Sequence, residues 1–409
     1  MIDPDSLRIL KPNDEPERRW SPDLAYLLDV GYRPFFLLAV LAAAALMLLW
    51  GVMLAGVDSG ARAVAAPAWH GHEMLWGYSG AILLGFLFTA GRNWTRHPTV
   101  NGRLLALAAL LWLGARLFMA LSGGAWAAFA IEIGVWFIAL WAIGRAIVKT
   151  RSTLNYPVLG LTAAFAASDI LWHLPVDPLL TRLWLALGLA SLTAILVIIG
   201  GRIIPAFTAS GVGSRPESRP WIEHSIWPLT LVCVLAFGLH PTGLVPPVLL
   251  AALACASAML HALRLWLWWD RGVLTVPLVW ILHGAYAMLV LHFALAAATA
   301  GYGSLAAAAL HSLTAGALGT MMIGMLARVA LGHGGRPLHV GLRTRLIFGL
   351  VFGGALLRIS AALSLPYAVQ IYRPMLLGAA GCWVVALLMY AWLYGPVLIR
   401  AGRGPIEKV

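Results

Sequence analysis

Long hydrophobic runs alternate with short polar segments along almost the whole chain. Runs bounded by charge, Pro or Gly predict about twelve segments, most of them near the roughly 20 residues that an α-helix needs to cross about 30 Å of hydrocarbon. The predicted spans are 37–57, 69–90, 104–121, 126–147, 156–173, 183–199, 226–239, 244–267, 276–298, 305–327, 346–365 and 375–398. The seventh is short for a span. We therefore expect an all-α fold, a polytopic transmembrane helix bundle.

The composition agrees with a chain that has the bilayer as its solvent. Hydrophobic residues make up 61% of the 409 residues and charged residues only 11%, whereas soluble domains carry about 25% charged residues. A soluble core cannot absorb that much apolar surface. The expected organisation is an N-terminal segment 1–36, a transmembrane domain 37–398 and a C-terminal tail 399–409, with 201–223 as the longest inner loop.

Basic residues indicate the orientation of the spans. The formal net charge is +12, but Lys and Arg punctuate the apolar runs and form no basic stripe, so a nucleic-acid partner is excluded. If both termini are cytoplasmic, only Arg62, Arg116, Arg182, Arg358 and Arg373 of the 28 basic residues fall on the outer side. That division is the one that the positive-inside rule requires. The first 36 residues contain no apolar stretch of a signal peptide, so the first span is expected to direct insertion.

Histidines are the candidate chemistry, because ionisable groups inside a membrane are costly and imidazole commonly binds iron, copper and zinc. The densest group, Trp69-His70-Gly71-His72-Glu73-Met74, opens the second span. On a regular helix His70 and His72 point about 200° apart, so they share one metal only if His70 precedes the helix proper. Glu73 is placed to orient an imidazole. The alternative is an interfacial pair bonded to headgroups or backbone.

Two further spans carry a histidine with suggestive neighbours. His311 is followed by Ala315, Gly316 and Gly319, a face of small side chains that either leaves room for a flat macrocycle or lets two helices pack closely. His283 has Tyr286 on its own face. At about 1.5 Å per residue, His283 lies roughly 10 Å from the inner edge and His311 roughly 10 Å from the outer edge. This difference predicts two centres at two depths.

The outer group then holds His70, His72 and His311, and the inner group holds His283 and His333. The other histidines, His173, His292, His240, His261 and His97, are predicted to be satisfied core or interfacial residues. Asp169 and His173, four residues apart, and Glu132 are either proton relays or a neutralised pair and an interfacial acid. Arg202 and Arg328 end spans on the inner side, where they either anchor the helices or pair with haem propionates.

Several sequence blocks, spread in order over nearly the whole chain, carry a family resemblance. They are Gly31-Tyr32-Arg33-Pro34-Phe35-Phe36, the block around His70 and His72, Asn93-Trp94-Thr95, residues 201–208, Leu282-His283-Gly284-Ala285-Tyr286, and the run from His311 through Arg328 to Gly332-His333. In these blocks the chain resembles the NnrS family, haem- and copper-containing membrane proteins of the bacterial nitric oxide response. The resemblance places His70, His72, His283, His311 and His333 on motif histidines and does not say which binds which metal.

The expectation from these residues is a multi-pass protein of the bacterial inner membrane that holds haem b, with copper as a second candidate cofactor. It would bind nitric oxide and relieve nitric oxide or nitrosative stress, with Glu73 and Tyr286 as candidate catalytic residues. A nitric oxide reductase-like activity with an unidentified electron donor is one interpretation. The alternatives are a secondary transporter, which also suits about twelve spans, and a haem-binding sensor without catalysis.

Overall fold

The computed structural model describes residues 23–56, 66–120, 125–174, 177–299, 305–402 and 406. In this part of the chain, twelve helices or continuous helical runs are long and apolar enough to cross a membrane, which confirms the all-helical prediction. They are α2 (Tyr32–Leu54), the run α3 (Ala66–His72), η2 (Glu73–Ser79) and α4 (Gly80–Thr95), α5 (Gly102–Ala120), α6 (Ala125–Lys149), α7 (Tyr156–Trp172), α8 (Pro178–Val212), α9 (Pro220–Leu239), α10 (Pro247–Trp268), α11 (Pro277–Thr299), the run α12 (Ala306–His311), η7 (Ser312–Gly319) and α13 (Thr320–His333), α14 (Leu342–Ser364) and α15 (Val369–Ile399). The predicted segment 1–36 and tail 399–409 lie partly outside the described residues.

The sixth span is the one whose end the sequence predicted least well. Its helix α8 has 35 residues and continues through Pro205 to Val212, whereas the sequence placed an inner loop from residue 201. Polar punctuation at Gly201 and Arg202 suggested that loop, but Arg202 donates to the Asn155 side chain at 2.6 Å and to the Leu154 carbonyl at 2.9 Å. These hydrogen bonds provide partners for the Arg202 guanidinium, so the charged residue can lie within α8. The seventh span, short in the sequence, has 23 residues, Pro220–Thr242.

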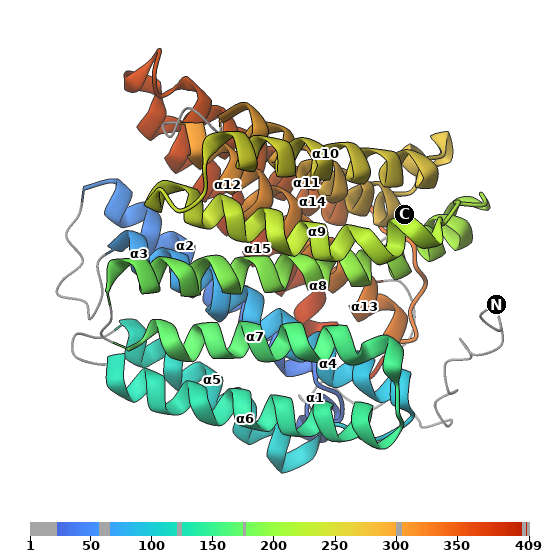
Figure 1. The fold of residues 1–409 in the computed structure, drawn as a ribbon. Coiled ribbons are helices and arrows are strands. Elements are labelled where there is room, and N and C mark those ends of the chain that lie inside the picture. Colours follow the sequence, from blue (N-terminus) through green and yellow to red (C-terminus); the bar gives the residue numbers. More distant parts are fainter. Residues whose placement is uncertain are drawn as a thin grey trace.

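The long helices run roughly side by side as a bundle (Figure 1). Helix α2 packs on α15 and α4, α7 packs on α6 and α8, and α11 packs on α10, α12 and η7. The second and tenth spans are the most enclosed, with 83% and 78% of their apolar windows buried. These two central spans also carry the motif histidines His70, His72, His311 and His333.

Each central span contains a π-helical segment directly after a histidine. Segment η2 begins at Glu73, after His72, and segment η7 begins at Ser312, after His311. A π-helix carries one extra residue per turn, so it changes the direction of the following side chains relative to those of a regular helix. Such segments are frequent at functional sites, which directs attention to the residues beside them.

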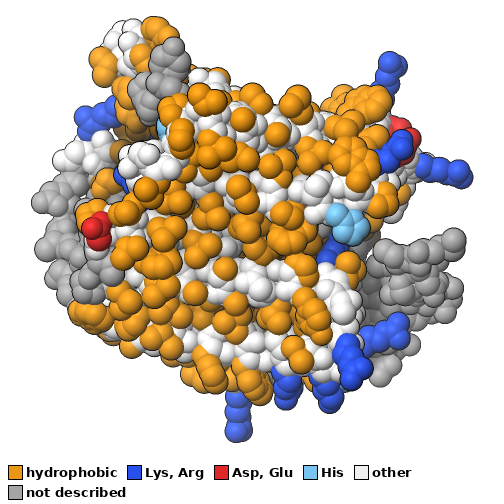
Figure 2. Space-filling model, in the orientation of Figure 1, with side chains coloured by type: hydrophobic (Ala, Val, Ile, Leu, Met, Phe, Trp, Pro, Cys, Tyr) orange, Lys and Arg blue, Asp and Glu red, His pale blue; other side chains and the backbone are white. Residues whose placement is uncertain are grey.

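The outer flank of the bundle is apolar. Hydrophobic side chains cover most of the visible flank in Figure 2, and Lys and Arg side chains gather mainly at its right-hand end and lower edge. Large apolar residues such as Phe137 and Trp266 are 70% and 71% exposed, which in water would favour aggregation and in lipid is the expected surface. The backbone N–H of Asp23 donates to the Ile399 carbonyl at 3.2 Å, so α1 (Leu24–Leu27) and the end of α15 lie at one end of the bundle.

Candidate metal centre

Two histidines of the WHGHEM block lie on one regular helix and point to different sides of it. His70 and His72 both belong to α3, so the break that would let them share a metal is not present. The ring of His70 stacks on Trp50 of α2, with centroids 4.5 Å apart. His72 is fully buried and its ring lies 4.5 Å from that of Trp172 at the end of α7. The predicted outer group is therefore divided into two places.

The His72 side of α3 contains four side chains with metal-ligand chemistry. Atom Nε2 of His72 lies 3.1 Å from Oδ1 of Asp169 and 4.0 Å from Oε2 of Glu132. The same Glu132 oxygen is 2.5 Å from Nε2 of His173. One ligand atom from each of the four residues lies within 4.8 Å of the other three. We call His72, Glu132, Asp169 and His173 the four-residue centre.

Neighbouring side chains form hydrogen bonds with the atoms of the four residues that point away from the middle of the centre. Oε1 of Glu73 contacts Nδ1 of His72 at 3.1 Å, and the Trp136 indole donates to Oδ2 of Asp169 at 2.7 Å. Arg116 of α5 donates to Glu73 at 2.8 Å and also to Oε1 of Glu132. One oxygen of Asp169 and one of Glu132 are therefore held by these donors, and the other oxygen of each carboxylate faces the two imidazoles and is free to bind a metal ion. Carboxylate-to-imidazole contacts of this kind orient metal-binding histidines.

Gly77 in η2 gives Arg116 the space to reach these carboxylates. A Cβ at this position would lie 2.8 Å from Nη1 of Arg116 and 3.3 Å from Oε2 of Glu73. The Gly77 carbonyl also accepts a hydrogen bond from the indole of Trp112, 3.2 Å away. The π-helical segment therefore brings backbone and side chains of the second span against α5.

The charge balance of the cluster leaves room for a cation. Glu73, Glu132 and Asp169 carry three negative charges when ionised, and Arg116 carries one positive charge. A divalent metal ion would neutralise the remainder if both imidazoles are neutral; two imidazolium ions would do the same. The first arrangement is a metal site, and the second is the neutralised ion pairing that the sequence left open for Asp169 and His173.

The donor set fits a metal ion. Two imidazole nitrogens and two carboxylate oxygens suit iron, zinc, copper(II) or manganese, and the set contains no thiolate. Among the residues that the structure describes, Nδ1 of His173, Oε2 of Glu73 and Nε of Arg116 are buried without a hydrogen-bond partner. Buried polar atoms usually have partners, so the centre has capacity for a further bound group. Sequence analysis did not predict His173 to be a metal ligand, and it identified Arg116 only as a basic residue on the outer side.

The other predicted metal ligands lie away from this cluster. His311 contacts the Ala307 carbonyl at 2.9 Å through Nδ1. His283 contacts the Val279 carbonyl at 3.2 Å and the Trp268 carbonyl at 3.4 Å. His333 is exposed, with its ring 5.5 Å from that of Tyr32. The predicted inner pair, His283 and His333, thus have different neighbours.

The face of small residues below His311 is filled. A Cβ at Gly316 would lie 2.9 Å from Cβ of Met288, and a Cβ at Gly319 would lie 2.8 Å from Cζ2 of Trp383. Of the two interpretations given from the sequence, close helix packing therefore holds for these glycines. A macrocycle beside His311 would have to lie elsewhere than along this face.

Arg202, Arg328 and Tyr286 have protein partners in the structure. The bonds of Arg202 to Asn155 and Leu154 are described above, and the Arg328 guanidinium lies 3.6 Å from the ring centroid of Phe207. Tyr286 is fully buried between Nδ1 of His261, at 2.7 Å, and Nη1 of Arg264, at 3.0 Å. Glu223 in turn accepts from Arg264 at 2.9 Å. Tyr286 therefore belongs to a second buried polar network, on α9, α10 and α11.

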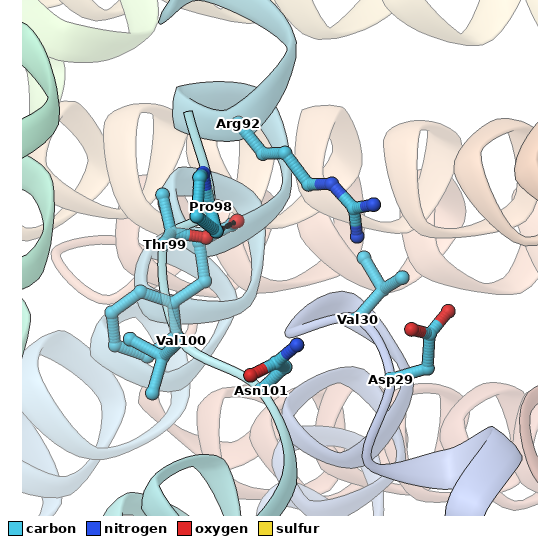
Figure 3. Close-up of a pocket in the computed structure, with 8 residues that line it drawn as sticks. Asp29, Val30, Arg92, Pro98, Thr99, Val100 and Asn101 are labelled. Atoms are coloured by element: carbon cyan, nitrogen blue, oxygen red, sulfur yellow. Dashed lines mark hydrogen bonds between the residues drawn. The ribbon is translucent and has the colours of Figure 1, made fainter. Parts of the chain in front are cut away.

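Figure 3 shows a small pocket between α4 and the segment preceding α5. Asp29, Val30, Arg92, Pro98, Thr99 and Asn101 are among its lining residues. It lies beside the end of α4, where the backbone N–H of Gly102 donates to the Leu28 carbonyl at 2.8 Å. It shares no residue with the four-residue centre, so the metal chemistry and this pocket are separate.

Comparison with known proteins gives the family. Residues 26–401 match the model of the family described as NnrS protein. The search of curated proteins finds no match. Since the family model covers nearly the whole chain, including every residue of the four-residue centre, the chain belongs to the NnrS family.

Proposed function

We propose that this multi-pass membrane protein serves the bacterial nitric oxide response by binding nitric oxide at a redox-active metal ion in the four-residue centre. The convergence of His72, Glu132, Asp169 and His173 carries the proposal. Membership of the NnrS family supports the physiological role. We place the protein in the bacterial inner membrane, with haem b as a further cofactor held by imidazoles outside this centre.

The metal ion, when bound, supplies a site for nitric oxide and a path for electrons from a donor that is not yet identified. The surrounding residues hold the ligands in place and keep water out. Glu73 fixes the tautomer and direction of His72 through Nδ1. Trp136 and Arg116 fix the carboxylates of Asp169 and Glu132. The buried Nδ1 of His173 has no hydrogen-bond partner among the described residues, so it can carry the proton of a neutral imidazole whose Nε2 faces the centre.

Iron and copper are the metals that we favour. Both metals bind nitric oxide and change oxidation state, whereas zinc has no redox chemistry. Two imidazoles with carboxylates are the donor set of non-haem iron(II) sites, and imidazole also suits copper. We propose reduction of nitric oxide as the activity of such a centre: two molecules of nitric oxide, two electrons from the donor and two protons would give one nitrous oxide and one water.

The test is metal analysis on the full chain purified in detergent, with His72→Ala and Asp169→Asn as variants and His224→Ala as the control. His224 is exposed on α9, and its Nδ1 lies 2.6 Å from the Pro220 carbonyl. We expect non-haem iron or copper in the wild type and in His224→Ala, and loss of this non-haem metal in both centre variants, with haem measured separately in each sample. Wild-type protein without non-haem iron or copper, or centre variants that retain it in full, would contradict the proposal.

A second measurement separates the alternatives. Reduced protein supplied with electrons should consume nitric oxide, and His72→Ala should not. A sensor would bind nitric oxide without consuming it. A transporter would be free of redox metal, so the metal analysis already distinguishes it.

A further inference from the structure

The second buried polar network, on α9, α10 and α11, contains hydrogen bonds whose directions follow from Thr230. The Thr230 hydroxyl donates its single hydrogen to the Ile226 carbonyl at 2.7 Å. The same oxygen lies 2.9 Å from Nε2 of His261. Because the hydroxyl hydrogen is already used, the oxygen accepts in this second contact. Nε2 of His261 therefore carries a proton.

His261 consequently accepts a hydrogen bond at its other nitrogen. Nδ1 lies 2.7 Å from the Tyr286 hydroxyl. A proton on both nitrogens would make His261 a cation close to Arg264, whose Nη1 donates to the same hydroxyl oxygen at 3.0 Å, and like charges at this separation repel. The neutral ring has a lone pair on Nδ1, so the Tyr286 O–H group donates to it.

This tyrosine and histidine pair lies away from water. Tyr286, His261 and Thr230 are fully buried. The ring of Phe293 is stacked on that of His261, with centroids 5.0 Å apart and an interplanar angle of 19°. Nδ1 of His261, at 2.7 Å, is therefore the base within reach of the phenol proton.

Arg264 holds the phenol oxygen from the other side. Its guanidinium also donates to the Val197 carbonyl at 3.1 Å and to Oε1 of Glu223 at 2.9 Å. Gly201, the first residue of the block 201–208, leaves space for this group, since a Cβ there would lie 2.8 Å from Cζ of Arg264. A guanidinium only donates, so it positions the phenol and does not take its proton.

Trp268 is an aromatic neighbour of Tyr286 near the apolar flank. The two ring centroids are 5.0 Å apart, with an interplanar angle of 62°. Trp268 is 1% exposed, whereas the next residue, Trp269, is 46% exposed. Aromatic rings in contact can pass an electron from one to the other. Tyr286 thus has one neighbour for an electron and another for a proton.

We infer that Tyr286 and His261 form a redox-active pair that reduces nitrogen dioxide to nitrite. Nitrogen dioxide forms from nitric oxide and dioxygen, and it is a small uncharged radical that dissolves in lipid, as an oxidant of a site inside the bilayer must. It takes one electron from Tyr286 and becomes nitrite. In the same step the O–H proton moves to Nδ1 of His261, and a neutral tyrosyl radical remains.

A hydroquinone in the bilayer returns the electron, and the proton held by His261 goes back to the phenol oxygen. Two rounds convert two molecules of nitrogen dioxide and one hydroquinone into two nitrite ions, one quinone and two protons. The step uses no metal ion and no residue of the four-residue centre. The inference therefore goes beyond the proposed function and does not depend on it.

The experiment exposes the full chain, in nanodiscs of saturated lipid, to nitrogen dioxide generated by pulse radiolysis of nitrate. Radicals are followed by absorption and, after freeze-quenching, by electron paramagnetic resonance. The variants are Tyr286→Phe, His261→Gln and Trp268→Phe. Tyr394→Phe is the control, because Tyr394 is also fully buried but its hydroxyl bonds to the Thr344 hydroxyl, at 2.9 Å. Elution volume in size-exclusion chromatography and thermal midpoint confirm folding.

We expect a long-lived tyrosyl radical in the wild type and in Tyr394→Phe, and its loss in Tyr286→Phe. Exposed tyrosines such as Tyr367 give only short-lived radicals, because further nitrogen dioxide reaches them from water. His261→Gln should slow formation of the long-lived radical about 100-fold, the effect typical of a positioned proton acceptor. Trp268→Phe should slow it as well.

The same long-lived radical in Tyr286→Phe, or its absence from the wild type, would overturn the inference, as would a wild-type rate in His261→Gln. If a variant does not fold, electron-nuclear double resonance on the wild type with isotope-labelled histidine decides. The radical oxygen must then accept a hydrogen bond from an exchangeable proton on an imidazole nitrogen. These readouts do not involve metal content, so the metal analysis tests the proposed function separately.

Discussion

His70 and His72 are two residues apart on α3, yet His70 stacks on Trp50 while His72 contacts Asp169 on the other side of the helix. At about 100° per residue, a two-residue step turns a side chain by about 200°. A single short block of sequence therefore places its two histidines in different surroundings on opposite sides of α3. Glu73, the first residue of η2, has its Oε1 3.1 Å from Nδ1 of His72.

The first prediction concerns Glu73. Glu73→Gln removes the charge that holds Nδ1 of His72, and loss of such an orienting carboxylate typically lowers metal affinity by about 10 to 100-fold. We expect a weakening of that size in a competition titration against a chelator. Glu217→Gln is the control, because Glu217 is an exposed carboxylate that pairs with exposed Arg219, and this variant should bind metal as the wild type does. Equal affinities in the two variants would show that Glu73 does not orient His72.

The second prediction concerns Arg116, which is 5% exposed and bonds to both Glu73 and Glu132. Arg116→Met keeps most of the apolar stem and leaves two buried carboxylates without their cation. Breaking a buried ion pair on one side costs about 3 to 5 kcal/mol, so we expect a large fall in the free energy of unfolding, measured by denaturant titration in mixed micelles.

The control for Arg116 is Arg92→Met, because Arg92 is exposed at the end of α4. Surface substitutions usually change stability by less than about 0.5 kcal/mol. A similar small effect of Arg116→Met would mean that Glu73 and Glu132 are not both ionised, and the charge argument for a metal ion at this centre would fail.

The sequence predicted the spans well and their ends less well. Hydrophobicity over 20 residues reports the cost of exposing polar groups to lipid, so it finds a span whatever its partners are. Helix α8 continues through Arg202, whose side chain bonds to Asn155, 47 residues earlier, and it ends at Val212, before Gly213 in the left-handed conformation. A contact over that separation leaves no trace in local hydropathy, and the predicted end fell several residues short.

The candidate site was predicted in part. The WHGHEM block and the intramembrane Asp169 and Glu132 were recognisable because ionisable groups in a span are unusual. The pairing of His72 with Asp169 and His173 was not, because it depends on how α3, α6 and α7 pack. The angle of about 200° between His70 and His72 on a regular helix already indicated that the two histidines belong to different sites, since they could share a metal only if α3 were broken between them.

The third prediction tests whether the small residues after His311 serve packing. Gly319→Ala places a methyl group against the Trp383 ring, a rigid neighbour, and overpacking of this kind typically costs about 1 to 3 kcal/mol. Gly381→Ala in α15, where the new methyl group meets nothing within 4 Å, should be neutral or gain up to about 1 kcal/mol from helix propensity. Thermal midpoints of both variants in one detergent give the comparison. Equal midpoints would mean that space remains beside Gly319.

The fourth prediction is the orientation of the bundle. Arg215 and Leu244 are exposed at opposite ends of α9, and the positive-inside rule puts Arg215 in the cytoplasm. In a background without Cys233, Cys255 and Cys382, we expect a membrane-impermeant maleimide to label Leu244→Cys in intact spheroplasts and Arg215→Cys only in inverted vesicles. The two variants are each other's control, because they differ by one membrane crossing. Labelling of Arg215→Cys in intact spheroplasts would reverse the orientation of the bundle. His70, His72 and His311 would then lie near the cytoplasmic face, and the electron donor would have to reach them from the cytoplasm.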